Sequence, residues 1–254
     1  MPQLHVLADE GDFAPIVLLP GDPNRATRIA ARFDGGLENA RLVNDNRGLL
    51  GYTGTFDGVR VSVQTTGMGT PTSSIVIEEL LNLGATTFIR VGTTGGFRHV
   101  EAGDVVVATA AAANTGVGPV LGEGEATAPA SDVDVMLALA EAARTSGLRT
   151  HVGPIVTSDV FYEPHPAGVV RWARRGYIAV EMESAALFLI AMREQGKGRA
   201  VRAGTILTVS DVLREPGAEE AEWTWLPREE LQQRIDLTIG AALLAAANLA
   251  RSGG

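Results

Sequence analysis

The order of apolar and amphipathic segments constrains the fold of this 254-residue chain more than any other feature. Short apolar runs typical of strands alternate with segments of helical periodicity along nearly the whole length. Such alternation is typical of α/β proteins, and neither an internal repeat nor a linker divides the chain. We therefore predict a single α/β domain over residues 1–254, with a central mixed β-sheet flanked by helices on both faces.

The expected elements follow from these patterns. Strands are predicted at Ile16–Leu19, Gly51–Phe56, Val59–Thr66, Thr87–Val91, Asp104–Ala112, His151–Thr157, Ala179–Val180 and Ala203–Val209. Helical or amphipathic segments are predicted at Arg25–Phe33, Ser73–Leu83, Val133–Ser146, Pro166–Arg175, Glu183–Gln195 and Arg228–Leu249. Asp57-Gly58 predicts a hairpin turn, and the Gly- and Pro-rich residues 116–129 predict a surface loop.

Composition excludes several classes of protein. A net charge of −9 argues against a nucleic-acid surface, and the absence of cysteine excludes disulfides and a thiol nucleophile. The four histidines lack metal-ligand spacing, so no metal site is expected. The N-terminus lacks the pattern of a signal peptide, and the apolar runs are too short or too Ala-rich to span a bilayer. We expect a soluble cytoplasmic enzyme with no membrane or nucleic-acid partner.

An arginine inside an apolar strand is the first candidate for chemistry. Arg90 stands in the run Phe88–Val91, and the residues Gly92–Gly96 that follow are glycines and threonines. A buried guanidinium needs a counter-charge. Glycine backbone N–H groups, Thr hydroxyls and the guanidinium together suit a phosphate-like anion. The alternative is a tight strand-to-loop turn with Arg90 paired to a buried carboxylate.

The segment Pro20–Arg25 offers the same chemistry at a second strand end. Gly21 exposes backbone N–H there, and Arg25 lies in the first turn of a helix, whose N-terminus attracts anions. The alternative is a Pro-Gly turn in which Asp22 caps the helix. Arg90 strengthens the anion hypothesis, because two strand ends then present the same groups.

A third segment, Thr65–Pro71, superficially resembles a dinucleotide fingerprint. Thr72 replaces its last glycine, and no acidic residue follows at about 20 residues, which disfavours a nicotinamide oxidoreductase. We expect a backbone approach to a ligand here, with Met68 either as an adaptable apolar contact or as part of the core.

Acidic residues mark two further strand ends. Glu181 and Glu183 flank Met182 and would share one strand face, where a carboxylate could accept two hydrogen bonds from a vicinal diol such as ribose. The alternative is a helix N-terminus that favours acidic residues. Asp211 follows an apolar strand and suits acid–base work, or else caps the next turn.

Eight strings in order resemble one family over nearly the whole chain. They resemble the nucleoside phosphorylases of the hexameric purine nucleoside phosphorylase and uridine phosphorylase type. The matching strings are His5, Pro20–Ala26, Asn46–Gly54, Thr65–Pro71, Ile89–Gly96, Ser158–Tyr162, Val180–Leu187 and Thr208–Asp211.

This resemblance implies phosphorolysis of nucleosides, with inorganic phosphate as co-substrate and no cofactor. It implies that Gly21, Arg25, Arg47, Arg90 and Thr93 bind phosphate. It implies that His5, Met68, Phe161, Glu181, Met182 and Glu183 bind the nucleoside, with Phe161 against the base and Glu183 at the ribose hydroxyls. His5 and Arg47 would reach a neighbouring subunit's site, so the dimer would be the smallest active unit of a homohexamer, a trimer of dimers.

The resemblance also bears on the base. Asp211 matches the residue that protonates the purine in the purine enzymes, with a pKa raised by burial and nearby carboxylates. The Gln and Arg that read uracil are absent after Phe161-Tyr162. Arg214 and Arg228 are candidates for the arginine that assists this Asp. Trp223 and Trp225 either close over the base or pack the final helix.

We therefore predict a purine nucleoside phosphorylase in which Asp211 and Arg90 act in catalysis. A uridine phosphorylase and a 5′-methylthioadenosine phosphorylase remain alternatives on the same fold. A nucleosidase, which uses water, would not need the arginines. A nucleoside-binding module without catalysis would not need Arg90 or Asp211.

Overall fold

A mixed sheet of ten strands forms the centre of the molecule in the structure, a computed structural model that describes residues 3–97, 99–163, 166–214 and 222–252. Its order is β10-β9-β6-β7-β8-β5-β1-β4-β3-β2. The strands are β1 (Ile16–Leu19), β2 (Arg41–Asn44), β3 (Gly51–Phe56), β4 (Val59–Gln64), β5 (Thr87–Gly96), β6 (Val105–Asn114), β7 (Thr150–Ser158), β8 (Ala179–Glu181), β9 (Arg202–Arg214) and β10 (Glu222–Trp225).

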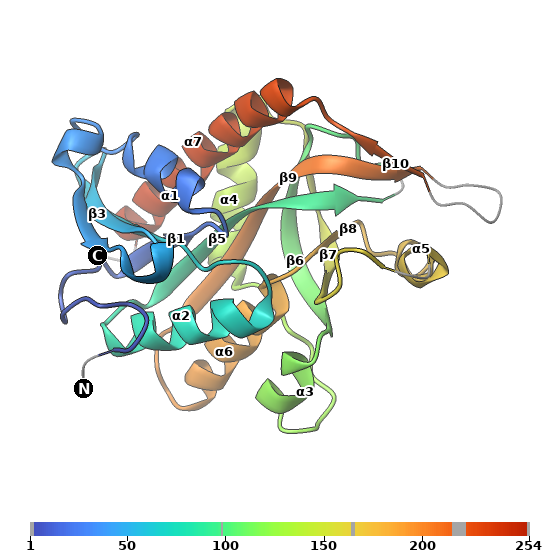
Figure 1. The fold of residues 1–254 in the computed structure, drawn as a ribbon, viewed down its shortest axis with the longest axis horizontal. Coiled ribbons are helices and arrows are strands. Elements are labelled where there is room, and N and C mark those ends of the chain that lie inside the picture. The colour runs from blue at the N-terminus through green and yellow to red at the C-terminus, as the bar shows by residue number, and fades with distance from the viewer. Residues whose placement is uncertain (1–2, 98, 164–165, 215–221, 253–254) are drawn as a thin grey trace.

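Five of these strands pair with one another in a closed ring. The strand β9 pairs with β6 and also, in parallel, with β5, while β7 and β8 link β6 back to β5. The ring β5-β9-β6-β7-β8 therefore leaves no free edge among its members. The long bent strands β5 and β9 cross the middle of the molecule together (Figure 1).

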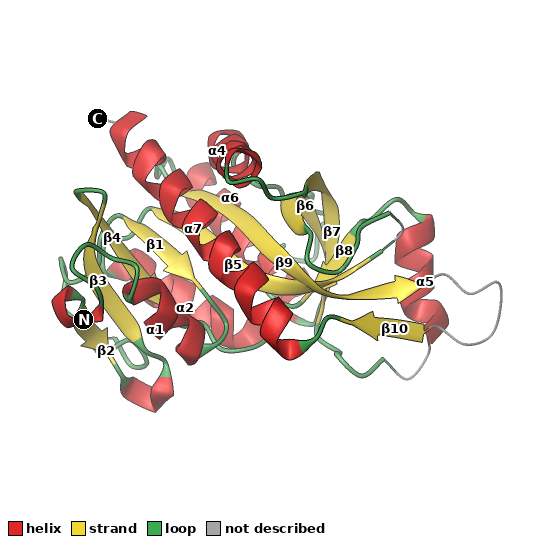
Figure 2. Cartoon of the chain, turned by 90° about the horizontal axis from the view of Figure 1, so that it is seen from above, coloured by secondary structure: helices red, strands yellow, loops and turns green. Residues whose placement is uncertain are grey.

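Helices cover both faces of the sheet, which confirms the predicted fold class. They are α1 (Pro23–Ala30), α2 (Thr70–Asn82), α3 (Val117–Leu121), α4 (Val133–Thr145), α5 (Pro166–Arg174), α6 (Ser184–Gly196) and α7 (Arg228–Ser252). Helices α1, α4 and α7 lie over one face, and α2 and α6 over the other (Figures 1 and 2). Each set buries its apolar face in its own core cluster against the sheet.

The final helix, α7, also satisfies the length and composition expected of a membrane span. In the described part of the chain it is the one helix that does so, and 56 % of its apolar window is buried. Its residues Ile235, Ile239, Leu243 and Leu249 are buried in one core cluster with α1 and α4. The helix α7 is therefore a core helix, and its apolar residues are those that the neighbouring elements cover.

Several predicted boundaries were wrong. The strand β5 continues through the glycines predicted as a turn, because β9 pairs with it from Thr87 to Gly96. For the same reason β9 runs past Asp211 to Arg214. The strands β2 and β10 were not predicted, and α3 forms a short helix inside the expected loop.

Candidate active site

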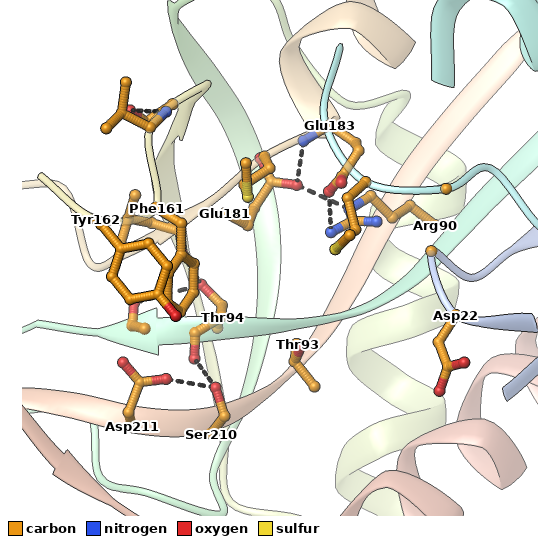
Figure 3. Close-up of a pocket in the computed structure, with 18 of the residues that line it drawn as sticks. Asp22, Arg90, Thr93, Thr94, Phe161, Tyr162, Glu181, Glu183, Ser210 and Asp211 are labelled. Atoms are coloured by element: carbon orange, nitrogen blue, oxygen red, sulfur yellow. Dashed lines mark hydrogen bonds and ion pairs between the residues drawn. The ribbon is translucent and has the colours of Figure 1, made fainter. Parts of the chain in front are cut away.

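A cavity of about 900 Å³ opens where β1, β5, β8 and β9 bring the predicted residues together. Every residue predicted to bind phosphate or nucleoside lines it except His5. Figure 3 shows Arg90, Glu181 and Glu183 grouped at one end, and Phe161, Tyr162 and Asp211 at the other. The volume lies within the range of small-molecule sites.

The guanidinium of Arg90 is buried and held by two carboxylates. Its Nε donates to Glu181 Oε2 at 2.8 Å, and its Nη2 forms an ion pair with Glu183. Burial alone would lower the pKa of Arg90, but the carboxylates of Glu183 and Glu181 outweigh burial and raise it. The alternative weighed for this residue, pairing with a buried carboxylate, is therefore present. Nη1 makes no hydrogen bond to the described part of the chain.

A missing side chain makes room for this arginine. A Cβ on Gly92 would lie 2.9 Å from Arg90 Cζ and 2.7 Å from Leu207 Cδ2. These distances are shorter than ordinary packing allows. Position 92 therefore requires glycine because the Arg90 side chain folds over it. The glycine is not there to form a turn, since β5 continues through this position.

Glu181 is fixed by four donors. Besides Arg90 Nε, it accepts hydrogen bonds from the Thr157 hydroxyl at 2.5 Å and from the backbone N–H groups of Glu183 and Ser184. The last two belong to the start of α6, so the helix N-terminus predicted as an alternative is also present. Glu181 is a rigid part of the site, because its acceptor capacity is used by the protein itself.

Glu183 has fewer protein partners than Glu181. It accepts a hydrogen bond from the Gly69 N–H at 2.6 Å and faces Arg90 Nη2. Burial raises the pKa of Glu183, Arg90 opposes this shift, and the neighbouring Glu181 adds to it. Glu183 accepts fewer hydrogen bonds from the described residues than Glu181 does, so its oxygens retain capacity to accept from a ligand's hydroxyls.

Arg25 is a second cation beside Arg90 and has no carboxylate partner. Its Nη1 donates to the Val91 carbonyl at 3.1 Å, and it makes no ion pair with the described residues. Burial lowers the pKa of Arg25 to about 10, and the charge on Arg90 adds to this. Arg25 stays protonated at neutral pH, so a cation without a counter-ion faces the cavity.

The loops around these arginines approach closely. A Cβ on Gly21 would lie 2.9 Å from the Gly67 carbonyl oxygen, so glycine is needed where the two loops meet. Asp22 caps α1 by accepting from the Asn24 N–H, as the alternative for this segment proposed. Arg47 has φ of 56°, a conformation unfavourable for a non-glycine residue. Such strain is found at functional sites.

The other end of the cavity is built by Asp211 and aromatic rings. Asp211 is buried within β9, and the Ser210 hydroxyl donates to its Oδ1. Burial raises the pKa of Asp211 to about 6, against the opposing effect of Ser210. The expected contribution of nearby carboxylates is absent among the described groups. Asp211 caps no turn, because the strand continues beyond it.

Aromatic side chains surround Asp211. Phe161 is 61 % exposed, and its ring centroid lies 5.0 Å from Tyr162 and 6.3 Å from Trp225. Trp223 and Trp225 both line the cavity. Trp223 packs in a core cluster with Phe97 and Leu213, and the Trp225 ring faces Phe161, so the contacts of both rings are with the cavity side rather than with the final helix. Exposed rings at a cavity mouth suit stacking on a planar base.

Three predicted residues lie differently from the rest. His5 is outside the cavity, and its Nδ1 lies 2.8 Å from Glu79 Oε1 on α2. Met68 lines the cavity but is 81 % exposed, which excludes the core position weighed for it. Arg228 is exposed and does not line the cavity. The side chain of Arg214, the other candidate partner of Asp211, lies outside the described residues.

Sequence reasoning missed several supporting groups. Thr157 orients Glu181, Ser210 bonds Asp211, and the Gly69 N–H holds Glu183. Glu79 binds the backbone N–H groups of residues 4–6. Ser210 adjoins Asp211 in the sequence and could have been found, whereas the others depend on contacts between distant elements. In the described part of the chain no cluster of three metal-binding side chains occurs.

Comparison with known proteins agrees with this geometry. The family described as the Phosphorylase superfamily matches residues 15–245. This chain belongs to that superfamily. Among curated members, it is 39 % identical over 241 residues to the Purine nucleoside phosphorylase DeoD-type of Clostridium perfringens (strain SM101 / Type A), covering 93 % of this chain and 99 % of that relative.

Other relatives in the superfamily are equally similar. Proteins with the same name from Exiguobacterium sp. and Roseobacter denitrificans are each 40 % identical. The first match covers 92 % of this chain and 99 % of the relative, and the second covers 96 % and 98 %. The resemblance predicted from eight short strings is thereby confirmed at the level of the family.

Proposed function

We propose that this chain catalyses phosphorolysis of purine nucleosides and deoxynucleosides, giving the free base and (deoxy)ribose 1-phosphate. The observation that carries this proposal is the pairing of two features in one cavity. An unpaired cation, Arg25, lies beside Arg90 at one end, and a buried carboxyl with a raised pKa, Asp211, lies at the other. The names of the curated relatives support the same reaction.

Phosphate would bind at the arginine end. Arg25 supplies a positive charge without a counter-ion, and Arg90 Nη1 and the hydroxyl of Thr93 add donors toward the same cavity. Phosphate held here lies close to the anomeric carbon, and proximity of this kind lowers the barrier. Its negative charge also stabilises the oxocarbenium-like sugar formed as the glycosidic bond breaks.

The sugar and base would extend toward Asp211. Glu183 would accept hydrogen bonds from the ribose hydroxyls, between Met68 and Met182, and Phe161 would stack on the base. Asp211 would donate its proton to the purine ring nitrogen as the electron pair of the glycosidic bond moves into the base. A carboxyl with a pKa near the working pH is suited to this step.

The release of hypoxanthine from inosine tests the reaction. We expect release only when inorganic phosphate is present, because the arginine end would have no attacking group without it. Release at equal rate in phosphate-free buffer would indicate a nucleosidase. Tight binding of inosine with no turnover would indicate a binding module. Faster cleavage of uridine or of 5′-methylthioadenosine would reassign the substrate on the same fold.

We also propose that a second copy of the chain completes the site, within a cytoplasmic homohexamer built as a trimer of dimers. His5 would reach the neighbour's cavity, and so would Arg47, which also lines the cavity of its own chain. Two observations support an interface beside α2. Met68 and Leu4 are 81 % and 77 % exposed although Met68 lines the cavity, and Ile75 on α2 is also exposed. Asn46 joins this face by donating to the His5 carbonyl.

A further inference from the structure

The strand β10 places two tryptophans beside the carboxyl group of Asp211. In the antiparallel pair of β10 and β9, Trp225 lies directly opposite Asp211, and Trp223 lies opposite Leu213. Directly opposed residues in such a pair project to the same face of the sheet. Both indoles therefore project to the side on which the Asp211 carboxyl lies.

Trp223 covers the neighbouring strand on that face. Gly95 of β5 pairs with Asp211 of β9, and a Cβ on Gly95 would lie 2.7 Å from the Trp223 ring. The same Cβ would lie 3.2 Å from Asp211 Oδ2. The indole and the carboxyl therefore meet above this glycine, and Phe97 supports the indole with a ring centroid 6.4 Å away.

Trp225 lines the cavity at the register position opposite Asp211. Its side chain is 55 % exposed, and its ring faces that of Phe161 across the opening. An indole in this position can limit the access of water to the Asp211 carboxyl. Because Trp225 is exposed, its side chain can be truncated without creating a cavity in the core.

Among the residues that the structure describes, the groups that face Asp211 from the elements packed against it are uncharged. The strand β9 contributes the Ser210 hydroxyl, β5 contributes Thr94 and Gly95, and the segment after β7 contributes Phe161 and the phenol of Tyr162. The other charged side chains that line the cavity are Asp22, Arg25, Arg47, Arg90, Glu163, Arg171, Glu181 and Glu183. Within the described residues, Asp211 forms no ion pair.

We propose that Trp223 and Trp225 are positioning residues that favour the protonated form of Asp211 by excluding water from it. Apolar surroundings disfavour a carboxylate, whereas an adjacent guanidinium would favour it. The raised pKa of Asp211, caused by burial, agrees with this arrangement.

The use of this proton rests on the proposed function. As the C–N bond breaks, its electron pair passes to the base, a phosphate oxygen bonds the anomeric carbon, and Asp211 donates its proton to the base. Asp211 is left as a carboxylate and regains a proton from water. A nucleoside already methylated at N7 carries a positive charge on the base, so its cleavage does not need this proton.

The test compares Trp225→Ala, Trp225→Phe and Trp223→Phe with the wild type by the pH dependence of kcat for inosine. We expect the alkaline limb of Trp225→Ala to move at least one pH unit lower, and Trp225→Phe to restore it. The kcat for cleavage of N7-methylinosine should change less than threefold in every variant. Trp172→Phe, which alters a cavity tryptophan packed on Tyr177, should leave the limb in place.

A direct titration separates this inference from the proposed function. The carboxyl carbon of Asp211, assigned with Asp211→Asn, is followed by NMR against pH in the free protein. A lower midpoint in Trp225→Ala, with an unchanged thermal midpoint, supports the inference even if no nucleoside is cleaved. An unmoved midpoint and an unmoved kinetic limb in all tryptophan variants would overturn it. An inactive wild type with a shifted midpoint would overturn the proposed function alone.

Discussion

Two arginines of the same cavity differ at the residue scale in what balances their charge. Arg90 is matched by Glu181 and Glu183, so it is part of a buried ion-pair network. Among the described residues Arg25 donates to the Val91 carbonyl and forms no ion pair, and it lies close enough to Arg90 for the two charges to repel. The first arginine therefore serves folding as well as binding, and the second stores unfavourable charge that an anion relieves.

Substitution by glutamine separates these roles. Arg90→Gln should lower the free energy of unfolding by about 3–5 kcal/mol, because it leaves buried carboxylates unpaired. Arg25→Gln should leave it unchanged or raise it slightly. Both should abolish the rise in melting temperature that phosphate gives the wild type by mass action. Thermal unfolding with and without phosphate measures this, and equal destabilisation by both substitutions would refute the distinction.

Asp211 should lower the stability of the fold above its pKa. Its pKa is about 6 in the folded chain against an ordinary value of 3.8, so the folded state holds the proton more tightly. Stability is therefore lost as pH rises from about 4 to about 6. Asp211→Asn should raise the free energy of unfolding at pH 8 by about 1–3 kcal/mol, and by much less at pH 4.5. Urea unfolding at both pH values checks this, and a gain that grows toward low pH would contradict the sign.

At the scale of elements, β5 shows how far sequence patterns reach. The apolar run before Arg90 correctly predicts a strand, but the glycines that follow it predict a turn where the strand in fact continues. Local patterns carry no information about β9, a partner more than a hundred residues away, whose pairing extends β5 to Gly96. The strand β10 was not predicted for the same reason. The contacts of Trp223 and Trp225 are with Phe97 and Phe161, which are distant in the sequence.

Gly92→Ala tests the role of glycine within β5. The added methyl would collide with Arg90 and Leu207, so we expect a loss of about 1–3 kcal/mol in unfolding free energy and a higher KM for phosphate. Gly196→Ala is the control, because a Cβ there meets no atom within 4 Å at the end of α6. The control should retain wild-type kinetics and stability. A wild-type KM in Gly92→Ala would show that the Arg90 geometry does not depend on this position.

For the whole molecule, the placement of the site follows from the closed ring of strands. Residues 21–25 after β1, Arg90 on β5, Glu181 on β8 and Asp211 on β9 reach one cavity because their strands are neighbours in the sheet. Sequence order alone could predict that strand ends converge, and it did so for most of the site. It could not predict the pairing of Arg90 with both glutamates or the position of His5 against Glu79.

Subunit association should depend on the exposed apolar face beside α2. Leu4→Asp or Ile75→Asp should dissociate the assembly and lower kcat/KM at least tenfold, because the neighbour would no longer contribute to the site. Val133→Asp, at an exposed apolar position on α4, is the matched control. Light scattering coupled to size exclusion gives the mass. Full activity in a monomeric variant would remove the neighbour from the mechanism.

The central claim is that phosphate, bound at the arginine end, attacks the sugar of a purine nucleoside. Phosphorus NMR of the protein with inosine and inorganic phosphate tests it most directly. We predict a new ribose 1-phosphate resonance that grows in equal amount with hypoxanthine as the phosphate signal falls. Hypoxanthine accompanied by free ribose, with the phosphate signal unchanged, would contradict the account.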